Sequence, residues 1–106
     1  MECTIEERKD YFIVNIPATL EGEEEVRKSL QLVDLTLQKK GIKIVIDVAS
    51  VSTVTSNILG LILQLAQLSQ VHKVGLELSG VSAKLKATFD ALLITKLFQG
   101  FGATIR

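Results

Sequence analysis

The alternation of apolar and polar residues predicts two short strands at the start of the chain. "CTIEER", residues 3–8, and "YFIVNIP", residues 11–17, are separated by a polar Lys-Asp pair that is typical of a tight turn. Pro17 ends the second run, because proline lacks the backbone N–H that a strand uses for pairing. The chain is therefore expected to open with a β-hairpin.

A helical period follows between residues 21 and 41. One helical face is formed, at steps of four, three and four residues, by Val26, Leu30, Val33 and Leu37. Three glutamates precede this face and two lysines follow it, which are the ends at which the helix dipole favours each charge. Gly41 is expected to end the helix in the left-handed conformation.

The middle of the chain predicts a strand and then a second helix. Consecutive β-branched residues at 44–46 are typical of a central strand with apolar neighbours on both faces. Residues 58–71 have a helical period with an apolar arc wider than one sheet contact requires. Part of this arc is therefore expected to face a partner.

The last third of the chain, from residue 73, again predicts a strand, a helix and a strand. Residues 73–80 have the two-residue period of a strand, and Ser82 is a suitable N-cap for a helix that bears Leu85, Phe89 and Leu92. "GFGATIR" is expected to form a turn and a short last strand. The predicted order is β-β-α-β-α-β-α-β, an α/β fold with a mixed, mostly parallel sheet. Without a repeat or a linker, residues 1–106 are expected to form a single domain.

Composition excludes several classes of partner. The 12 basic and 12 acidic residues give no net charge, so nucleic acid is not expected as a partner. The single cysteine cannot form an internal disulfide, which indicates a reducing, cytoplasmic location. The longest apolar segment, Ile58 to Leu68, is too short to cross a bilayer and has no charge, so direct membrane insertion is not expected either.

Catalytic chemistry is sparse. One cysteine and one histidine cannot build a usual zinc site, and no glycine-rich phosphate loop occurs, so no cofactor is expected. His72 lies at a predicted helix end, where the carbonyl dipoles favour an imidazolium. Asp47 ends the central strand without a second carboxylate to form an acid/base pair. The chain is therefore not expected to be an enzyme.

A run of hydroxyl groups, "ASVSTVTSN" at residues 49–57, joins the central strand to the next helix. The N-terminus of a helix offers unpaired N–H groups and a partial positive charge, so a phosphate on Ser56 would find donors nearby. Ser, Thr and Asn are also the preferred N-cap residues, so Thr55, Ser56 or Asn57 could act only as a cap. Both interpretations stay open at this stage.

The passage "IVIDVASVSTVTSNILGLIL", residues 44–63, resembles the STAS family, the sulfate transporter and anti-sigma factor antagonist domain. In that family the central strand ends in "DLSGV", and "DSSGLG" follows at the start of the next helix. Here "DVASV", Asp47 to Val51, and "TSNILG", Thr55 to Gly60, fall in register with these motifs. "YFIVNIPATLEG" at residues 11–22 is similar to the family's second strand. The resemblance covers residues 1 to about 100.

The resemblance implies a non-enzymatic binding module that is similar to an anti-sigma factor antagonist. Its partner would be a serine kinase anti-sigma factor, and phosphorylation of Ser56 would release that partner. The implied partner-binding residues are Thr53, Thr55, Asn57, Ile58, Leu59 and Gly60. Three of them depart from the family motif: Thr55 replaces Asp, Asn57 replaces Ser and Ile58 replaces Gly. Thr53 and Thr55 remain alternative phosphate acceptors.

A second interpretation is a STAS scaffold without a phosphorylation switch. It would belong to a stress-signalling complex, or it would be the cytoplasmic subunit of a membrane lipid transporter and pack against the transporter's ATPase. The charged helix that usually ends the family's domain is not expected after "LLITKLF", residues 92–98. The apolar surface left exposed there could pair with another subunit, which would make the chain a homodimer.

Overall fold

Five strands form one mixed sheet in the computed structural model, which describes residues 3–106. They are β1 (Thr4–Glu7), β2 (Tyr11–Asn15), β3 (Lys43–Asp47), β4 (Leu76–Ser79) and β5 (Thr104–Ile105). Their order in space follows the chain, with β1 antiparallel to β2 and the other neighbours parallel. The predicted mixed sheet with residues 44–46 in its centre is confirmed. Residues 1 and 2 of the expected domain lie outside the described residues.

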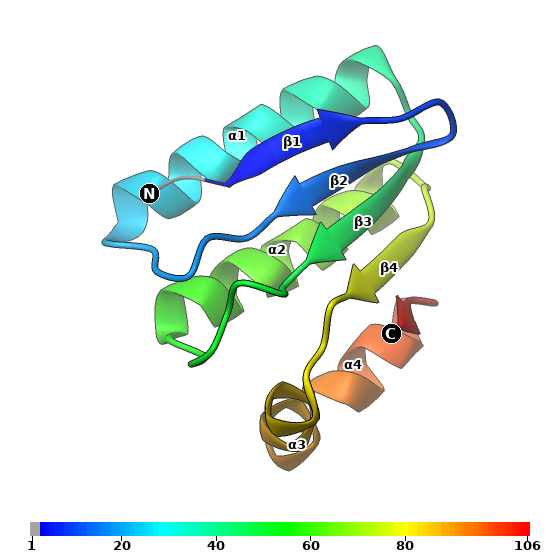
Figure 1. Cartoon of the computed structure of the whole chain (residues 1–106). Coiled ribbons are helices and arrows are strands. Elements are labelled where there is room, and N and C mark those ends of the chain that lie inside the picture. The colour runs from blue at the N-terminus through cyan, green and yellow to red at the C-terminus, as the bar shows by residue number, and fades with distance from the viewer. Residues whose placement is uncertain (1–2) are drawn as a thin grey trace.

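The helices all pack on one face of this sheet. They are α1 (Glu23–Lys39), α2 (Ser56–Val71), α3 (Ala83–Ala91) and α4 (Ile94–Gly100). In a parallel sheet whose strands follow chain order, right-handed crossovers carry every helix to the same side. Figure 1 shows α1 and α2 side by side behind the sheet, with α3 and α4 at the end beyond β4. The domain therefore has two layers.

The core lies between these layers. Alternate strand residues face the helices and are almost completely removed from solvent, among them Phe12, Val14, Ile44, Ile46 and Leu78. α2 lies over the middle of the sheet and contributes six buried residues, Ile58, Leu61, Ile62, Leu65, Ala66 and Ser69. Each large apolar side chain buried in this way stabilises the fold by about 1.5–3 kcal/mol.

The other face of the sheet is not covered by a helix within the described residues (Figure 1). Val45 lies on this face between Ile13 and Glu77, its partners on the neighbouring strands. The Glu77 carboxylate is held by the Lys43 ammonium at 3.1 Å and by the Arg106 guanidinium at 3.6 Å. On this face Val45 is buried, with the apolar Ile13 on one side, as predicted, and the charged Glu77 on the other.

The end of α1 also differs from the prediction. Lys40 has an extended backbone, with φ −138° and ψ 102°, and its N–H donates to the Thr36 carbonyl at 2.9 Å. Gly41 is not among the glycines with positive φ. The chain extends directly from α1 towards β3, so the predicted left-handed glycine is not needed there.

The last predicted helix is in fact two helices. Ser82 caps α3 as predicted, accepting the Leu85 N–H at 3.1 Å. The chain then turns at Leu92 and Leu93, because Leu93 adopts the left-handed conformation with φ 61°. Leu92 was predicted to continue the helical spacing of Leu85 and Phe89, but it lies in the turn after α3 and is 53% exposed. The observed order is therefore β-β-α-β-α-β-α-α-β.

Candidate functional site

The loop between β3 and α2 begins at the carboxyl edge of the sheet. Asp47 ends β3, and its Oδ1 accepts the Ala49 N–H at 2.8 Å, which turns the chain. Gly80 follows β4 with φ 76° and lies so close that a β-carbon there would be 2.8 Å from this Oδ1. Asp47 therefore has a structural role: it holds the loop against the end of the neighbouring strand.

Thr55 is the N-cap of α2. Its backbone is extended, with φ −96° and ψ 165°, and its Oγ1 accepts the Ile58 N–H at 3.2 Å. The sequence left Thr55, Ser56 and Asn57 as candidate caps, and the structure assigns this role to Thr55. The Thr55 hydroxyl is therefore already used within the chain.

Ser56 is the first residue of α2 and is exposed to solvent. Within residues 3–106, no hydrogen bond to its side chain is found. The first N–H groups of a helix have no partner inside the helix, and Thr55 satisfies only the one at Ile58. The first turn of α2 carries no acidic residue. Ser56 therefore places an accessible hydroxyl beside unpaired donors and a positive dipole end.

Two neighbours hold this helix end in place. The Asn57 side-chain amide donates to the Leu20 carbonyl at 3.1 Å, which links α2 to the segment after β2. Ile58 is fully buried in the core. The Asn57 contact could not be found from the sequence, because its partner is a backbone carbonyl 37 residues away.

The predicted site residues separate into two groups. Ser56, Asn57 and Gly60 line a groove of 420 Å³ between the N-terminal ends of α1 and α2. The α1 side of this groove is formed by Glu23, Val26, Arg27 and Leu30. Thr53 lies exposed in the loop, whereas Leu59 is partly buried against the core. The α1 residues were not predicted as part of the site.

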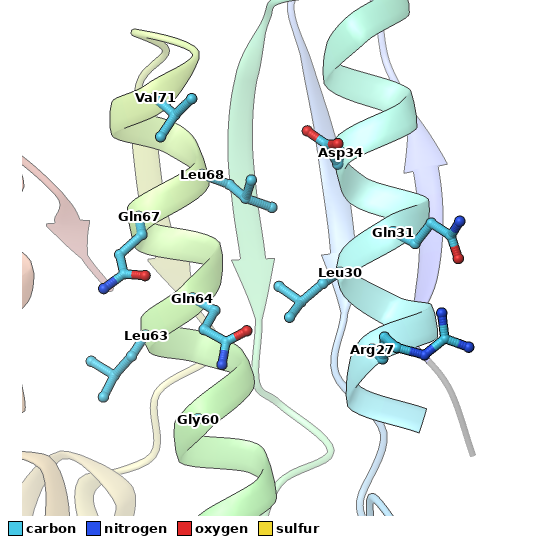
Figure 2. A pocket seen from close by; sticks show the side chains of 10 residues that line it. All are labelled: Arg27, Leu30, Gln31, Asp34, Gly60, Leu63, Gln64, Gln67, Leu68 and Val71. Atoms are coloured by element: carbon cyan, nitrogen blue, oxygen red, sulfur yellow. The ribbon is translucent and has the colours of Figure 1, made fainter. Parts of the chain in front are cut away.

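A second groove of 760 Å³ continues between the same helices towards the C-terminal end of α2. Figure 2 shows its lining, in which leucine and glutamine side chains predominate. Both grooves share Arg27, Leu30, Gly60 and Gln64. A β-carbon at Gly60 would meet no heavy atom of the described residues within 4 Å, so the helix surface there is open.

The charges along these grooves are mostly paired within the chain. The Arg27 guanidinium lies 2.6 Å from a Glu24 carboxylate oxygen, and this hydrogen bond lowers the pKa of Glu24. At the far end, the His72 Nε2 lies 3.0 Å from the Asp34 Oδ1 and links α2 to α1. His72 follows the last turn of α2, as predicted, but its pairing with Asp34 was not foreseen. Glu23 forms no ion pair within residues 3–106.

The described part of the chain offers no cluster of three or more residues able to hold a metal ion. His72 follows the end of α2 opposite to Ser56, and a 16-residue helix is about 24 Å long, so the imidazole cannot act as a base for that hydroxyl. None of the helices in residues 3–106 combines the length and the apolar character that a membrane span requires. The arrangement can accept a phosphate or contact a protein.

No protein-family profile matches this sequence, and neither does any curated protein sequence. Solved structures do match. A variant of RsbS from Moorella thermoacetica is 17% identical, over 96% of this chain and 85% of that one, with a TM-score of 0.75. An anti-sigma-factor antagonist (STAS) domain protein from Planctomyces limnophilus is 15% identical, over 99% and 90%, with a TM-score of 0.71.

The anti-sigma factor antagonist SpoIIAA, in its unphosphorylated form, is 15% identical over 98% of this chain and 86% of its own, with a TM-score of 0.68. At these identities, the likeness concerns the course of the backbone. The matches extend over nearly the whole chain and most of each relative. The chain therefore has the STAS-like fold of the anti-sigma factor antagonist domains.

Proposed function

We propose that this chain is a non-enzymatic, cytoplasmic regulatory module that binds a serine kinase anti-sigma factor and is switched by phosphorylation of Ser56. The observation that carries the proposal is the state of the hydroxyl groups at the start of α2. The Thr55 hydroxyl caps the helix, whereas the Ser56 hydroxyl is exposed and unbonded within the described residues. Ser56 is therefore favoured over Thr55 as the acceptor.

A phosphate on Ser56 would act through its charge. It would add nearly two negative charges beside unpaired N–H groups at the end of α2, which stabilise an anion. It would also face Glu23, which lines the same groove and carries a like charge. The modified surface would then be more negative than the unmodified one, and a partner fitted to the unmodified surface would be released.

The open helix surface at Gly60 supports a protein as the ligand. Glycine inside a helix is destabilising by about 1 kcal/mol relative to alanine. Gly60 has no positive φ, and no neighbour in the described residues fills the space that its missing side chain leaves. Neither the backbone nor the packing requires glycine here, so we attribute it to the close approach of a partner.

One observation favours a second candidate, the scaffold without a switch. Ile58 stands where the family motif has a flexible glycine, and its side chain is fully buried. Together with the Asn57 bond to Leu20, it fixes the loop end that a kinase active site would have to accommodate. In this case α2 would dock on a signalling scaffold or a transporter ATPase regardless of phosphorylation.

The test is affinity capture from the lysate of the source organism with wild-type protein, Ser56→Ala and Ser56→Asp, followed by mass spectrometry. We expect a serine kinase to be held by the wild type and by Ser56→Ala and to be lost from Ser56→Asp. Ser52→Asp is the matched control, because Ser52 is exposed in the same loop but precedes the helix. Its capture should equal that of the wild type.

Incubation of the purified kinase with ATP should then phosphorylate the wild type, and peptide mapping should place the phosphate on Ser56. Phosphate on Thr53 or Thr55 instead would move the switch to another hydroxyl. Equal capture of a scaffold or an ATPase by all four proteins would refute the switch. Gly60→Leu should abolish capture in either case, because its side chain would fill the groove.

A further inference from the structure

Three leucines are exposed at the turn between α3 and α4. The exposed fractions are 53% for Leu92, 65% for Leu93 and 47% for Leu97. The other large apolar side chains of these two helices are buried in the core, namely Leu85, Phe89, Ile94 and Phe98. These four side chains form the contact of the two helices with the core, so the leucines of the turn are not needed to complete it.

The backbone at this turn also carries strain. Leu93 is left-handed with φ 61°, a conformation that glycine or asparagine usually adopts at the end of a helix. The Leu92 and Leu93 N–H groups donate to the Thr88 and Asp90 carbonyls, both at 3.1 Å, which fixes the turn. Leucine at position 93 is thus unfavourable for two reasons: its backbone is left-handed, and its apolar side chain is exposed to water. A contact outside the chain would account for it.

The surface around the leucines is positively charged. From residue 81 to residue 100 the sequence contains the cations Lys84, Lys86 and Lys96 but a single carboxylate, Asp90. Hydrogen bonds from the Thr95 hydroxyl at 2.6 Å and the Lys86 ammonium at 3.1 Å lower the pKa of Asp90. Within residues 3–106, neither Lys84 nor Lys96 forms an ion pair, and both are exposed.

Lys96 lies directly beside the apolar surface. Leu93, Lys96 and Leu97 are spaced by three and four residues at the start of α4, so they share one face of this helix. Lys96 and Leu97 also line one small hollow. α3 and α4 lie together at the end of the molecule beyond β4 (Figure 1). The leucines are thus exposed on this part of the molecule with a cation among them.

This combination fits a negatively charged lipid surface. Lysine stems can lie along apolar material while their ammonium groups contact anionic headgroups. A second copy related by a two-fold axis through this surface would bring Lys96 near its own counterpart, which is unfavourable. Charge therefore favours an anionic occupant, and neither Leu92 nor Leu93 lines one of the two grooves or the small hollow described, which favours a broad surface over a groove-bound segment.

We propose that the α3–α4 turn docks on an anionic lipid bilayer, with Leu92, Leu93 and Leu97 entering the interface and Lys84 and Lys96 contacting the headgroups. The contact is peripheral and uses other elements than residues 58–68, for which the sequence predicted no membrane insertion. It does not depend on a partner for Ser56. The surface for that partner lies on α1 and α2.

Vesicle co-sedimentation of the full chain tests this proposal. We expect binding to vesicles of phosphatidylcholine with phosphatidylserine, no binding to phosphatidylcholine alone, and a loss of binding as the salt concentration rises. Leu93→Asn should weaken binding about tenfold, because an apolar side chain is lost from the interface. Lys96→Gln should weaken it about fivefold, the effect of one lysine near an anionic surface.

The matched controls are Leu35→Gln, which changes a leucine on α1 that is 50% exposed, and Lys39→Gln on the same helix. Both should bind like the wild type. Asparagine tolerates the left-handed conformation, so Leu93→Asn should unfold at the same temperature as the wild type or higher, which separates lost docking from lost folding. Failure of the wild type to bind either vesicle, or equal losses in Leu93→Asn and Leu35→Gln, would overturn the proposal.

Discussion

The N-terminal ends of α1 and α2 border the same groove but are built in opposite ways. α1 begins after Gly22, which has no side chain to cap the helix, and carries three glutamates in its first turn. α2 begins after the capping residue Thr55, and its 16 residues include no charged side chain. The positive dipole end of α1 is thus already matched by carboxylates, whereas that of α2 is not.

This difference explains why a phosphate would be accommodated at one helix end only. An anion added to the first turn of α1 would meet three like charges, whereas at Ser56 it would meet unpaired N–H groups. One of these glutamates, Glu23, forms part of the groove wall across from Ser56. α1 therefore shapes the electrostatic response of α2 to modification.

The largest expected difference between the two helix ends concerns their anchoring. Ile58→Ala should lower the free energy of unfolding by about 2–5 kcal/mol, because a fully buried side chain is removed. Val26→Ala, in the first turns of α1, should cost about 1 kcal/mol, because Val26 is only partly buried. Urea denaturation measures both. Equal losses would mean that the start of α2 is no better anchored than that of α1.

The second-largest effect is expected from the N-cap of α2, for which α1 has no side-chain equivalent. Thr55→Ala removes the acceptor of the Ile58 N–H and should lower the free energy of unfolding by about 1 kcal/mol, whereas Thr55→Ser should retain most of it. The control Thr53→Ala, in the exposed loop, should stay within about 0.5 kcal/mol of the wild type. Thermal unfolding of the three variants tests this. If Thr55→Ala left the free energy of unfolding unchanged, the cap would not contribute to the difference between the two helix ends.

Two glycine substitutions should have opposite signs. Gly60→Ala should raise the free energy of unfolding by about 0.5–1 kcal/mol, because alanine favours the helix and its β-carbon meets nothing. Gly22→Ala should lower it by about 1 kcal/mol, because φ is 92° at that position. Urea midpoints check the signs. Destabilisation by Gly60→Ala would show that this glycine serves the chain's own packing.

The smallest effect should appear in acid. The hydrogen bond from Arg27 lowers the pKa of Glu24, so the folded chain holds this carboxylate ionised at a lower pH than the unfolded chain does. Its contribution to stability is present above the ordinary pKa of about 4.3 and is lost as the pH falls through the lowered value. Glu24→Gln should therefore flatten the decline of the urea midpoint below about pH 4. An unchanged decline would contradict this.

Much of the fold could be predicted because each element carries its own periodic pattern. The helical spacing that includes Val33 and Leu37 predicted α1, and the run of β-branched residues at 44–46 predicted β3. The split between α3 and α4 was missed because a leucine, not a glycine, adopts the left-handed turn at position 93. Side-chain spacing predicts a continuous helix there, and only the backbone reveals the break.

The candidate site was predictable to a smaller extent. The hydroxyl run drew attention to Ser56 and its neighbours because these residue types share a local role at helix ends. The α1 side of the groove was missed, because the placement of Arg27 and Gly60 on opposite walls of the groove depends on how two helices pack. No short motif records that packing. The pairing of His72 with Asp34 was missed for the same reason.

The uncovered face of the sheet has a consequence for solubility. An uncovered sheet surface with Tyr11 exposed and Ile13 partly exposed on it would be able to stack against the same surface of another molecule. The nearly buried Glu77, with Lys43 and Arg106 on its carboxylate, places fixed charges in the middle of that surface. Stacking two sheets face to face would strip water from these ions, so the charge cluster disfavours such stacking.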